Sequence, residues 1–228
     1  MTESGKPRRS ARGREVRADR PPLTRERIVA AALALIDRHG VSGLSMRKLG
    51  AELAVDPMAI YYYLPNKSAL FDAVVEAIYA ELDVASIPRA GDWREQLAAV
   101  MHRFRDTLRR HPRALPIVAT RPATMPVLVE IVERALELME DAGFSAQETV
   151  DIINCLGTFT IGHALAEVGE PVGGETPNAG LSLDPTLVDQ YPRLARALAA
   201  GIEYRPDETY ALGLSAMLNA FRPRRRRR

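Results

Sequence analysis

The stretch SMRKLGAELAVDPMAIYYYLPNK, residues 45–67, carries the strongest structural signal in the chain, because its apolar spacing predicts two short helices joined by a tight turn. In the first of these helices Leu49 and Leu53 are four residues apart, so they share one face. Arg47 and Lys48 lie off that face. The pattern therefore indicates a support helix with a basic flank.

The second helix of the pair has clear start and stop signals. Asp56 can cap its N-terminus through the carboxylate, and Pro57 suits the first helical position, where the missing N–H costs nothing. We expect Pro65 to end the helix. Ile60 and Leu64 then form its inward-facing stripe.

The opposite face of this second helix carries apolar and aromatic side chains. Met58, Ala59 and Tyr62 lie on it, with Tyr61 and Tyr63 on its flanks. These residues could pack within a helical hairpin, although three consecutive tyrosines on so short a helix cannot all be buried. Alternatively, the two helices and their turn match a helix-turn-helix, in which the second helix lies in the major groove of DNA.

Length and composition indicate an ordinary helical protein. With 228 residues and 46% hydrophobic residues, the chain can bury a sizeable core. Helix formers dominate and no convincing alternating pattern occurs, so we expect an all-α fold. The single cysteine, Cys155, excludes an internal disulfide. Because no apolar run is long enough to span a bilayer, we expect a cytoplasmic protein without a membrane partner.

Basic and acidic residues are segregated along the chain. Residues 1–67 contain 13 Lys and Arg against 7 Asp and Glu, whereas residues 68–221 contain 12 against 22. Residues 222–228 are almost all arginine. A basic N-terminal part favours binding to a polyanion, while an acidic remainder resists lying along one.

Composition and periodicity divide the chain into four segments. Residues 1–22 are expected to form a disordered basic arm, which could contact DNA phosphates or the minor groove, or could simply aid solubility. Residues 23–84 are expected to form the helix-turn-helix domain with a connecting helix. Residues 85–222 would form a larger ligand-binding and dimerisation domain, and residues 223–228 a basic tail.

Helix signals recur within these segments. Thr24 is a plausible N-cap for a first helix that we expect to end at Gly40, and Asn66 is one for the connecting helix. Capping boxes at Asp92–Glu95 and Ser145–Glu148 start two more helices. The other expected features are breaks at Pro112 and Pro116 and helices over Val127–Asp141, Ala146–Val168, Tyr191–Ala200 and Asp207–Arg222.

The chain resembles the bacterial tetracycline-repressor family of transcription factors. In the helix-turn-helix part the similarity lies in Gly43–Leu49, Leu53–Val55, Ile60–Leu64 and Asn66–Lys67. Beyond it, Thr120–Pro122, Gly143–Ser145 and Phe159–Gly162 resemble the effector-binding domain of the tetracycline repressors themselves. The resemblance implies a homodimer whose two DNA-binding heads are held by a four-helix bundle, and whose operator is released when a small molecule enters the body.

The same resemblance shows where this chain departs from the tetracycline class. Ile117 stands where that class has a metal-binding histidine, and Ala166 stands where it has a metal-side glutamate. With a one-residue deletion, Val100 takes the place of a drug-binding asparagine. Because Ile and Ala cannot hold a chelated cation, we expect no metal and no cofactor.

A DNA-binding site follows from the second helix and the basic flank before it. Arg47 has the long bidentate donor near the groove face, so we assign it a guanine edge. The groove-facing side chains are expected to contact thymine methyl groups, and the flanking ones with Lys67 to hold phosphates. The predicted DNA-binding residues are Arg47, Lys48, Pro57, Met58, Ala59, Tyr61, Tyr62, Tyr63 and Lys67.

A pocket for a small hydrophobic effector is predicted in the larger domain. The helix expected over Ala146–Val168 is apolar on most sides, so one wall can line a pocket while another faces a second protomer. Each lining residue taken alone is more simply read as core. The predicted lining is Met101, Phe104, Ile117, Val118, Leu128, Ile131 and Phe159, with Arg121, Asn154 and Thr158 as polar anchors.

Two other functions remain compatible with the sequence. The chain could coat DNA without regard to sequence through its basic ends, which a comparison of operator with random duplex would reveal. It could also be a helical-bundle enzyme that uses Cys155 and His163. Eight residues apart on a helix, these side chains are separated by about 12 Å along the axis, too far for a direct hydrogen bond. We therefore expect neither enzymatic activity nor catalytic residues.

Overall fold

The computed structural model describes residues 21–121, 126–169 and 188–223. Across these ranges all regular secondary structure is helical, which confirms the all-α prediction. Most of the expected N-terminal arm, up to residue 20, and the tail from residue 224 onwards lie outside the described residues.

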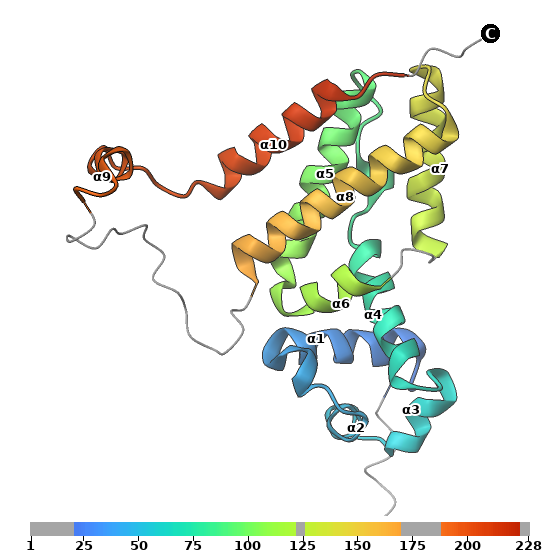
Figure 1. Ribbon diagram of the computed structural model, residues 1–228. Helices are drawn as coiled ribbons and strands as arrows, with labels where there is room; N and C mark the ends of the chain where they lie inside the picture. Colours follow the sequence, from blue (N-terminus) through green and yellow to red (C-terminus); the bar gives the residue numbers. More distant parts are fainter. Residues whose placement is uncertain (1–20, 122–125, 170–187, 224–228) are drawn as a thin grey trace, which may run out of the picture.

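The first three helices form a unit that we call the head, at the lower end of Figure 1. They are α1 (Arg25–Gly43), α2 (Met46–Leu53) and α3 (Pro57–Tyr63). Thr24 caps α1 as predicted, because its hydroxyl accepts a hydrogen bond from the Arg27 N–H at 3.2 Å. Gly40, with φ of 69° and ψ of 173°, interrupts the helix where its end was predicted, and helical turns resume beyond it to Gly43.

The helix α4 (Lys67–Ala80) leads from the head to the rest of the chain, which we call the body. Its N-cap is Asn66, as expected, since the Asn66 side chain accepts a hydrogen bond from the Ala69 N–H at 2.8 Å. After α4 a short helical turn, η1 (Val84–Ser86), begins the connection to the body.

The body consists of longer helices that start where the capping boxes predict. Both Asp92 and Ser145 make reciprocal capping contacts with the glutamate three residues on. The helix that Asp92 caps ends before Pro112 and Pro116, as the predicted breaks require, and each proline lies in the first turn of the next short helix, where proline is tolerated. The elements are α5 (Trp93–Arg110), η2 (Pro112–Ala114), α6 (Leu115–Thr120), α7 (Pro126–Asp141), α8 (Ala146–Val168), α9 (Pro192–Ala199) and α10 (Pro206–Ala220).

In Figure 1, α10 lies along α5 and α8, whereas α9 stands away from the other helices. Gly213 allows α10 to approach closely, because a Cβ there would lie 2.6 Å from the Phe159 ring. α9 contains no buried residue. Within the described ranges, the other helices therefore leave α9 largely uncovered.

Two hydrophobic clusters hold these helices together. The first runs from the head into the body, joining α1, α2 and α3 to α4, α6 and the C-terminal half of α5. The second lies within the body and joins α5, α7, α8 and α10 around Trp93, Met139 and Tyr210. Head and body consequently share part of one core.

Candidate functional site

The turn between α2 and α3 is set by local contacts of its own residues. Asp56 accepts a hydrogen bond from the Met58 N–H at 2.8 Å and caps α3 as expected. Ala54 takes the left-handed conformation, with φ of 55°, and ends α2. A Cβ on Gly50 would lie 3.0 Å from the Val55 carbonyl and 3.1 Å from Pro57. A side chain at Gly50 would therefore press α3 away from α2.

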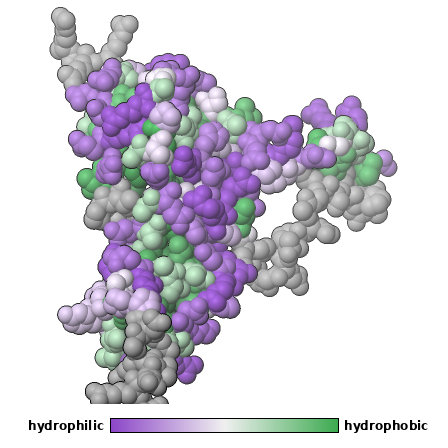
Figure 2. Space-filling model, turned by 180° about the vertical axis from the view of Figure 1, so that it is seen from behind, coloured by the Kyte–Doolittle hydropathy of each residue, from purple (hydrophilic) through white to green (hydrophobic). Residues whose placement is uncertain are grey.

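α3 is buried on one face and open on the other. Ile60 is fully buried and Leu64, just after the helix, is 3% exposed, as predicted for the inward stripe. Met58 and Tyr62 are 71% and 88% exposed. Tyr61 is about half as exposed as Tyr62, at 38%. In Figure 2 the α3 end of the head projects at lower left as a pale surface of intermediate hydropathy.

The basic residues beside this face differ in their bonding. Arg47 and Lys48 are exposed on α2, and in the described structure their side chains make no hydrogen bond or ion pair. Lys67 is exposed as well, but its Nζ donates to the Leu44 carbonyl at 3.0 Å and lies 5.2 Å from the Phe71 ring centroid. Lys67 therefore holds the start of α4 against the turn before α2.

Polar contacts join the head to the body on α1 and α4. His111 follows α5, and its two ring nitrogens lie 2.9 Å from an Asp37 carboxylate oxygen and 3.1 Å from one of Glu81. Arg121, expected as a pocket anchor, instead donates to the Ser68 carbonyl and pairs with Asp72 on α4. These contacts link the ends of α5 and α6 in the body to α1 and α4 through charged side chains.

The residues predicted to line an effector pocket fall into four groups. Phe104, Ile117, Val118 and Leu128 are buried in the core cluster shared by head and body. Phe159 stacks on Tyr210, with ring centroids 5.4 Å apart. Asn154 and Thr158 are exposed on α8 rather than turned inward. Met101 and Ile131 do line a cavity.

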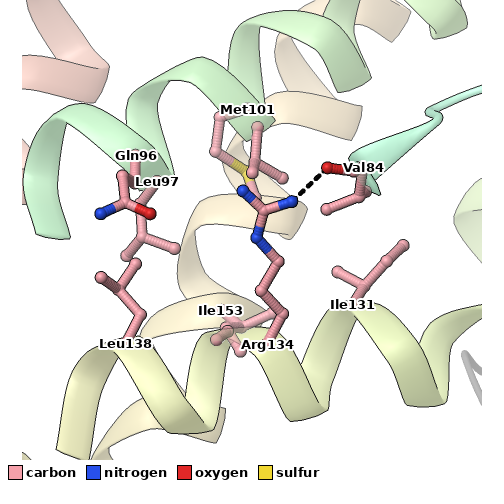
Figure 3. A pocket seen from close by; sticks show the side chains of 10 residues that line it. Val84, Gln96, Leu97, Met101, Ile131, Arg134, Leu138 and Ile153 are labelled. Atoms are coloured by element: carbon pink, nitrogen blue, oxygen red, sulfur yellow. Dashed lines mark hydrogen bonds between the residues drawn. The ribbon is translucent and has the colours of Figure 1, made fainter. Parts of the chain in front are cut away.

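This cavity lies between α5, α7, α8 and the η1 turn (Figure 3). It encloses about 30 Å³ of open space. Its walls are mainly apolar, and its polar side chains are Gln96 and Arg134. The complete lining is Val84, Gln96, Leu97, Val100, Met101, Ile131, Arg134, Ala135, Leu138 and Ile153.

Arg134 was not among the residues predicted from the sequence, although a signal for it exists. It follows Ile131 by three residues and precedes Leu138 by four, so helical periodicity places it on the apolar face of α7. In the structure its Nη1 and Nη2 donate to the carbonyls of Val84 and Ile87, the latter at 2.7 Å. The signal in the sequence is therefore a cation on an otherwise apolar helix face.

A second polar cluster joins α5, α8 and α10. Arg105 pairs with Glu167 at 2.7 Å, and both side chains are at least nine-tenths buried. Tyr210 donates to the Met101 carbonyl at 3.0 Å and contacts the Thr160 hydroxyl at 2.9 Å. Burial, and then the positive charge of Arg105, lower the pKa of His163, while Glu167 opposes that shift.

The two residues of the enzyme alternative are in different surroundings. Cys155 is exposed, beside Ile152 and Phe221 in a shallow cavity near the end of α10. His163 packs edge-on against the Tyr210 ring, with centroids 5.1 Å apart. The structure does not bring the thiol and the imidazole together.

The described residues contain no cluster of three or more His, Cys, Asp or Glu that could hold a metal ion. None of the described helices is long and apolar enough to cross a bilayer.

Family models match both parts of the chain. Residues 28–74 match the model for bacterial regulatory proteins of the tetR family, and residues 87–222 match the tetracyclin repressor-like C-terminal domain. The two matches include the head with most of α4, and nearly all of the body.

The similarity to individual relatives extends over most of the chain. The tetracycline repressor protein class A from transposon 1721 of Escherichia coli is 35% identical over 206 residues, which are 87% of this chain and 90% of that protein. The transcriptional repressor DrrR1 of Streptomyces coeruleorubidus is 30% identical over 188 residues, 82% of this chain and 69% of its own.

Among solved structures, the tetR-family protein ActR of Streptomyces coelicolor, in complex with actinorhodin, has a TM-score of 0.72 at 26% identity. The match covers 87% of this chain and 94% of ActR. TetR of Acinetobacter baumannii has a TM-score of 0.67 at 26% identity, over 88% and 97% of the two chains. The chain therefore belongs to the tetracycline-repressor family of transcriptional regulators, which bind operator DNA as dimers and respond to ligands.

Proposed function

We propose that this protein represses transcription from a palindromic operator and leaves it when a small hydrophobic effector enters the body. The observation that carries the proposal is the outer face of α3, where Met58 and Tyr62 are 71% and 88% exposed while Ile60 beneath them is fully buried. Exposed apolar and aromatic side chains beside a basic flank suit the methyl groups and phosphates of a major groove.

Individual contacts follow from this placement. Arg47 would read a guanine, because its guanidinium is exposed and has no partner in the described structure. Met58, Ala59 and Tyr62 would contact thymine methyl groups. Residues 23–84 would then act as the DNA-binding unit, and residues 85–222 as the unit that binds the effector and the second protomer.

The helices α8 and α10 supply the surface for that second protomer. Leu165 on α8 and Leu212 on α10 are 42% and 73% exposed, which is unusual for leucines on well-packed helices. Asn154 and Thr158 lie on the same exposed side of α8 as Leu165, since their spacing returns to one helical face. A partner that covers this side would bury all of them.

The effector would be an organic molecule bound without a metal. Ile117 and Ala166, where the tetracycline class has metal ligands, are apolar, and Ile117 is only 6% exposed within the core. We place the protein in the cytoplasm, where chromosomal DNA is accessible, and assign it no enzymatic activity. A sequence-indifferent DNA coat is not favoured by the family membership.

The proposal is tested by selecting duplexes from a random library with the purified protein. We expect a palindrome with half-site centres about 34–36 Å apart, or a multiple, because a two-fold dimer presents two heads. Tyr62→Ala should abolish selection. The matched control Tyr204→Ala, at a 56% exposed position in the body, should leave it intact. A single asymmetric half-site, or a monomer by sedimentation, would contradict the proposal.

Metal independence needs a separate measurement. Tetracycline is titrated with magnesium and with EDTA, and bound fraction and operator release are recorded. We expect neither tight binding nor release, because the metal ligands are missing. Tight binding that EDTA abolishes would show that Ile117 and Ala166 have been misread.

A further inference from the structure

The effector cavity has an asymmetric wall. Leu97, Met101, Ile131 and Leu138 surround it with apolar side chains. The guanidinium of Arg134 lies across it, as Figure 3 shows. Gln96 is the other polar side chain in this lining. Any ligand that enters therefore meets a hydrophobic enclosure with one fixed positive charge.

The bonding of Arg134 leaves part of that charge unsatisfied. A guanidinium has five N–H donors, and the described acceptors are two backbone carbonyls, those of Val84 and Ile87. No carboxylate within the described residues pairs with Arg134, whereas nearby Arg89 pairs with Glu137 at 3.1 Å. A partly buried cation bonded only to carbonyls gains most from an anionic partner.

We propose that the effector is an apolar molecule carrying a carboxylate or a comparable planar oxyanion, and that Arg134 binds this group. The inference rests on the proposed function and deepens it by naming the class of ligand. A carboxylate can accept two parallel hydrogen bonds from a guanidinium. The amide nitrogen of Gln96, the other polar side chain of the lining, already donates to the Gly91 carbonyl at 3.2 Å, so Arg134 is the anchor for the anion. The apolar part of the ligand then lies against Leu97, Ile131 and Leu138.

The size of the cavity indicates how such a ligand would act. Open space of about 30 Å³ admits roughly one water molecule, whereas pockets for drug-sized ligands hold about 300–1,000 Å³. A ligand must therefore push side chains aside, and the Arg134 side chain crosses the space that it needs. Because Arg134 also holds the Val84 and Ile87 carbonyls, its displacement reaches the connection between α4 and α5.

The same lining disfavours other ligand classes. It contains no acidic or histidine side chain, so it has no donor set for a metal chelate and no counter-charge for an organic cation. A neutral apolar molecule could fill the space, but it would leave the guanidinium without an anion. Arg134 therefore discriminates between ligands by their charge, whereas the apolar lining discriminates only by their shape.

The test compares biphenyl-4-carboxylate with biphenyl-4-carboxamide, which have nearly the same shape and differ in charge. Binding is measured by thermal shift and by titration calorimetry on the full-length protein. We expect the wild type to prefer the carboxylate by about 10- to 100-fold, the range that charge-assisted hydrogen bonds provide. Arg134→Gln should remove this preference and leave the carboxamide affinity within about threefold.

Two further variants keep the test decisive. Arg89→Gln removes a positive charge from an exposed pair on the α4–α5 connection, outside the cavity, and should leave the carboxylate preference unchanged. If Arg134→Gln does not fold, Arg134→Lys replaces it; with the charge kept but the bidentate geometry lost, the preference should shrink without vanishing. Equal affinity of the wild type for both compounds, an undiminished preference in the Arg134 variant, or no binding of the carboxylate at about 1 mM would overturn the proposal.

Operator binding is measured in parallel, so that failure of this inference can be separated from failure of the proposed function. If the carboxamide binds and releases the operator while the carboxylate has no advantage, the repressor function stands and the role of Arg134 is wrong. If the carboxylate binds through Arg134 but the operator stays bound, the ligand class stands and control by this ligand is wrong.

Discussion

The Nδ1 atom of His111 lies 2.9 Å from a carboxylate oxygen of Asp37, so the end of α5 in the body is bonded directly to α1 in the head. The other ring nitrogen faces Glu81, just after α4, at 3.1 Å. Only 12% of the His111 side chain is exposed. One residue thus joins three helices that must move together if the body is to reposition the head.

Asp37→Ala should destabilise the protein by about 1–2 kcal/mol, because it leaves a mostly buried imidazole nitrogen without its partner. Chemical denaturation provides the measurement. The control is Glu52→Ala, which removes the exposed pair with Arg38 and should cost no more than about 1 kcal/mol. Equal losses in the two variants would mean that the His111–Asp37 contact stabilises the protein no more than an exposed ion pair does.

Arg47→Ala should weaken operator binding by about 1–3 kcal/mol and relax the preference at one base position, since a bidentate guanine contact is lost. Arg47→Lys should also relax the preference at that base position, because lysine keeps the charge but lacks the fork geometry of the guanidinium. Competition binding against single-base operator variants measures both effects. An equal loss on operator and on random duplex would show that Arg47 contacts the backbone instead.

Lys67→Ala should weaken binding to every sequence alike and lower the slope of log affinity against log salt by about one unit, as expected for one lost phosphate contact. Its Nζ already donates to the Leu44 carbonyl, and an ammonium has two further donors for a phosphate. An unchanged salt slope would mean that Lys67 serves only to fix α4 against the head.

His163 should make the stability of the fold depend on pH below about 6.5, the ordinary histidine pKa. Burial, and secondly the charge of Arg105, lower its pKa in the folded state, so the unfolded chain binds the proton more readily. The contribution of His163 to the free energy of unfolding is therefore fully present above the pKa of the unfolded state. It is lost as the pH falls from there towards the lowered pKa of the folded state.

His163→Leu should flatten that part of the pH profile, measured as the free energy of unfolding at several pH values. His39→Gln, at an exposed position in the head, is the matched control and should retain the slope. If the His163 variant loses stability on acidification as steeply as the wild type, other groups are responsible.

The features that the sequence predicted correctly depend on neighbours in the chain. Asp56 and Asn66 cap helices through contacts two or three residues away, and Ile60 is buried because the helical repeat puts it on one side. Such signals need no knowledge of the tertiary fold. Gly40 shows their limit, since a helix end was predicted there but the helical turns that resume beyond it were not.

The lining of the cavity was harder to predict because it depends on how the helices pack. Asn154 and Thr158 seemed suitable anchors on an apolar helix, yet the rotation of α8 turns them outward. Arg121 pairs with Asp72, 49 residues away in the chain, and Arg134 donates to backbone carbonyls of a distant segment. Long-range polar partners of this kind have no periodic signature, although the position of Arg134 on the apolar face of α7 does.

The core cluster shared by head and body restricts how this protein can be recombined with its relatives. Leu35 and Ile36 of α1 belong to the same cluster as Leu115 and Val118 of α6. A chimera that imports a foreign head at residue 64 would place new side chains against an unchanged α6, and mismatched volumes there cost stability. Hybrid regulators with altered operator preference should therefore exchange only the outer face of α3, leaving the shared interior in its native pairing.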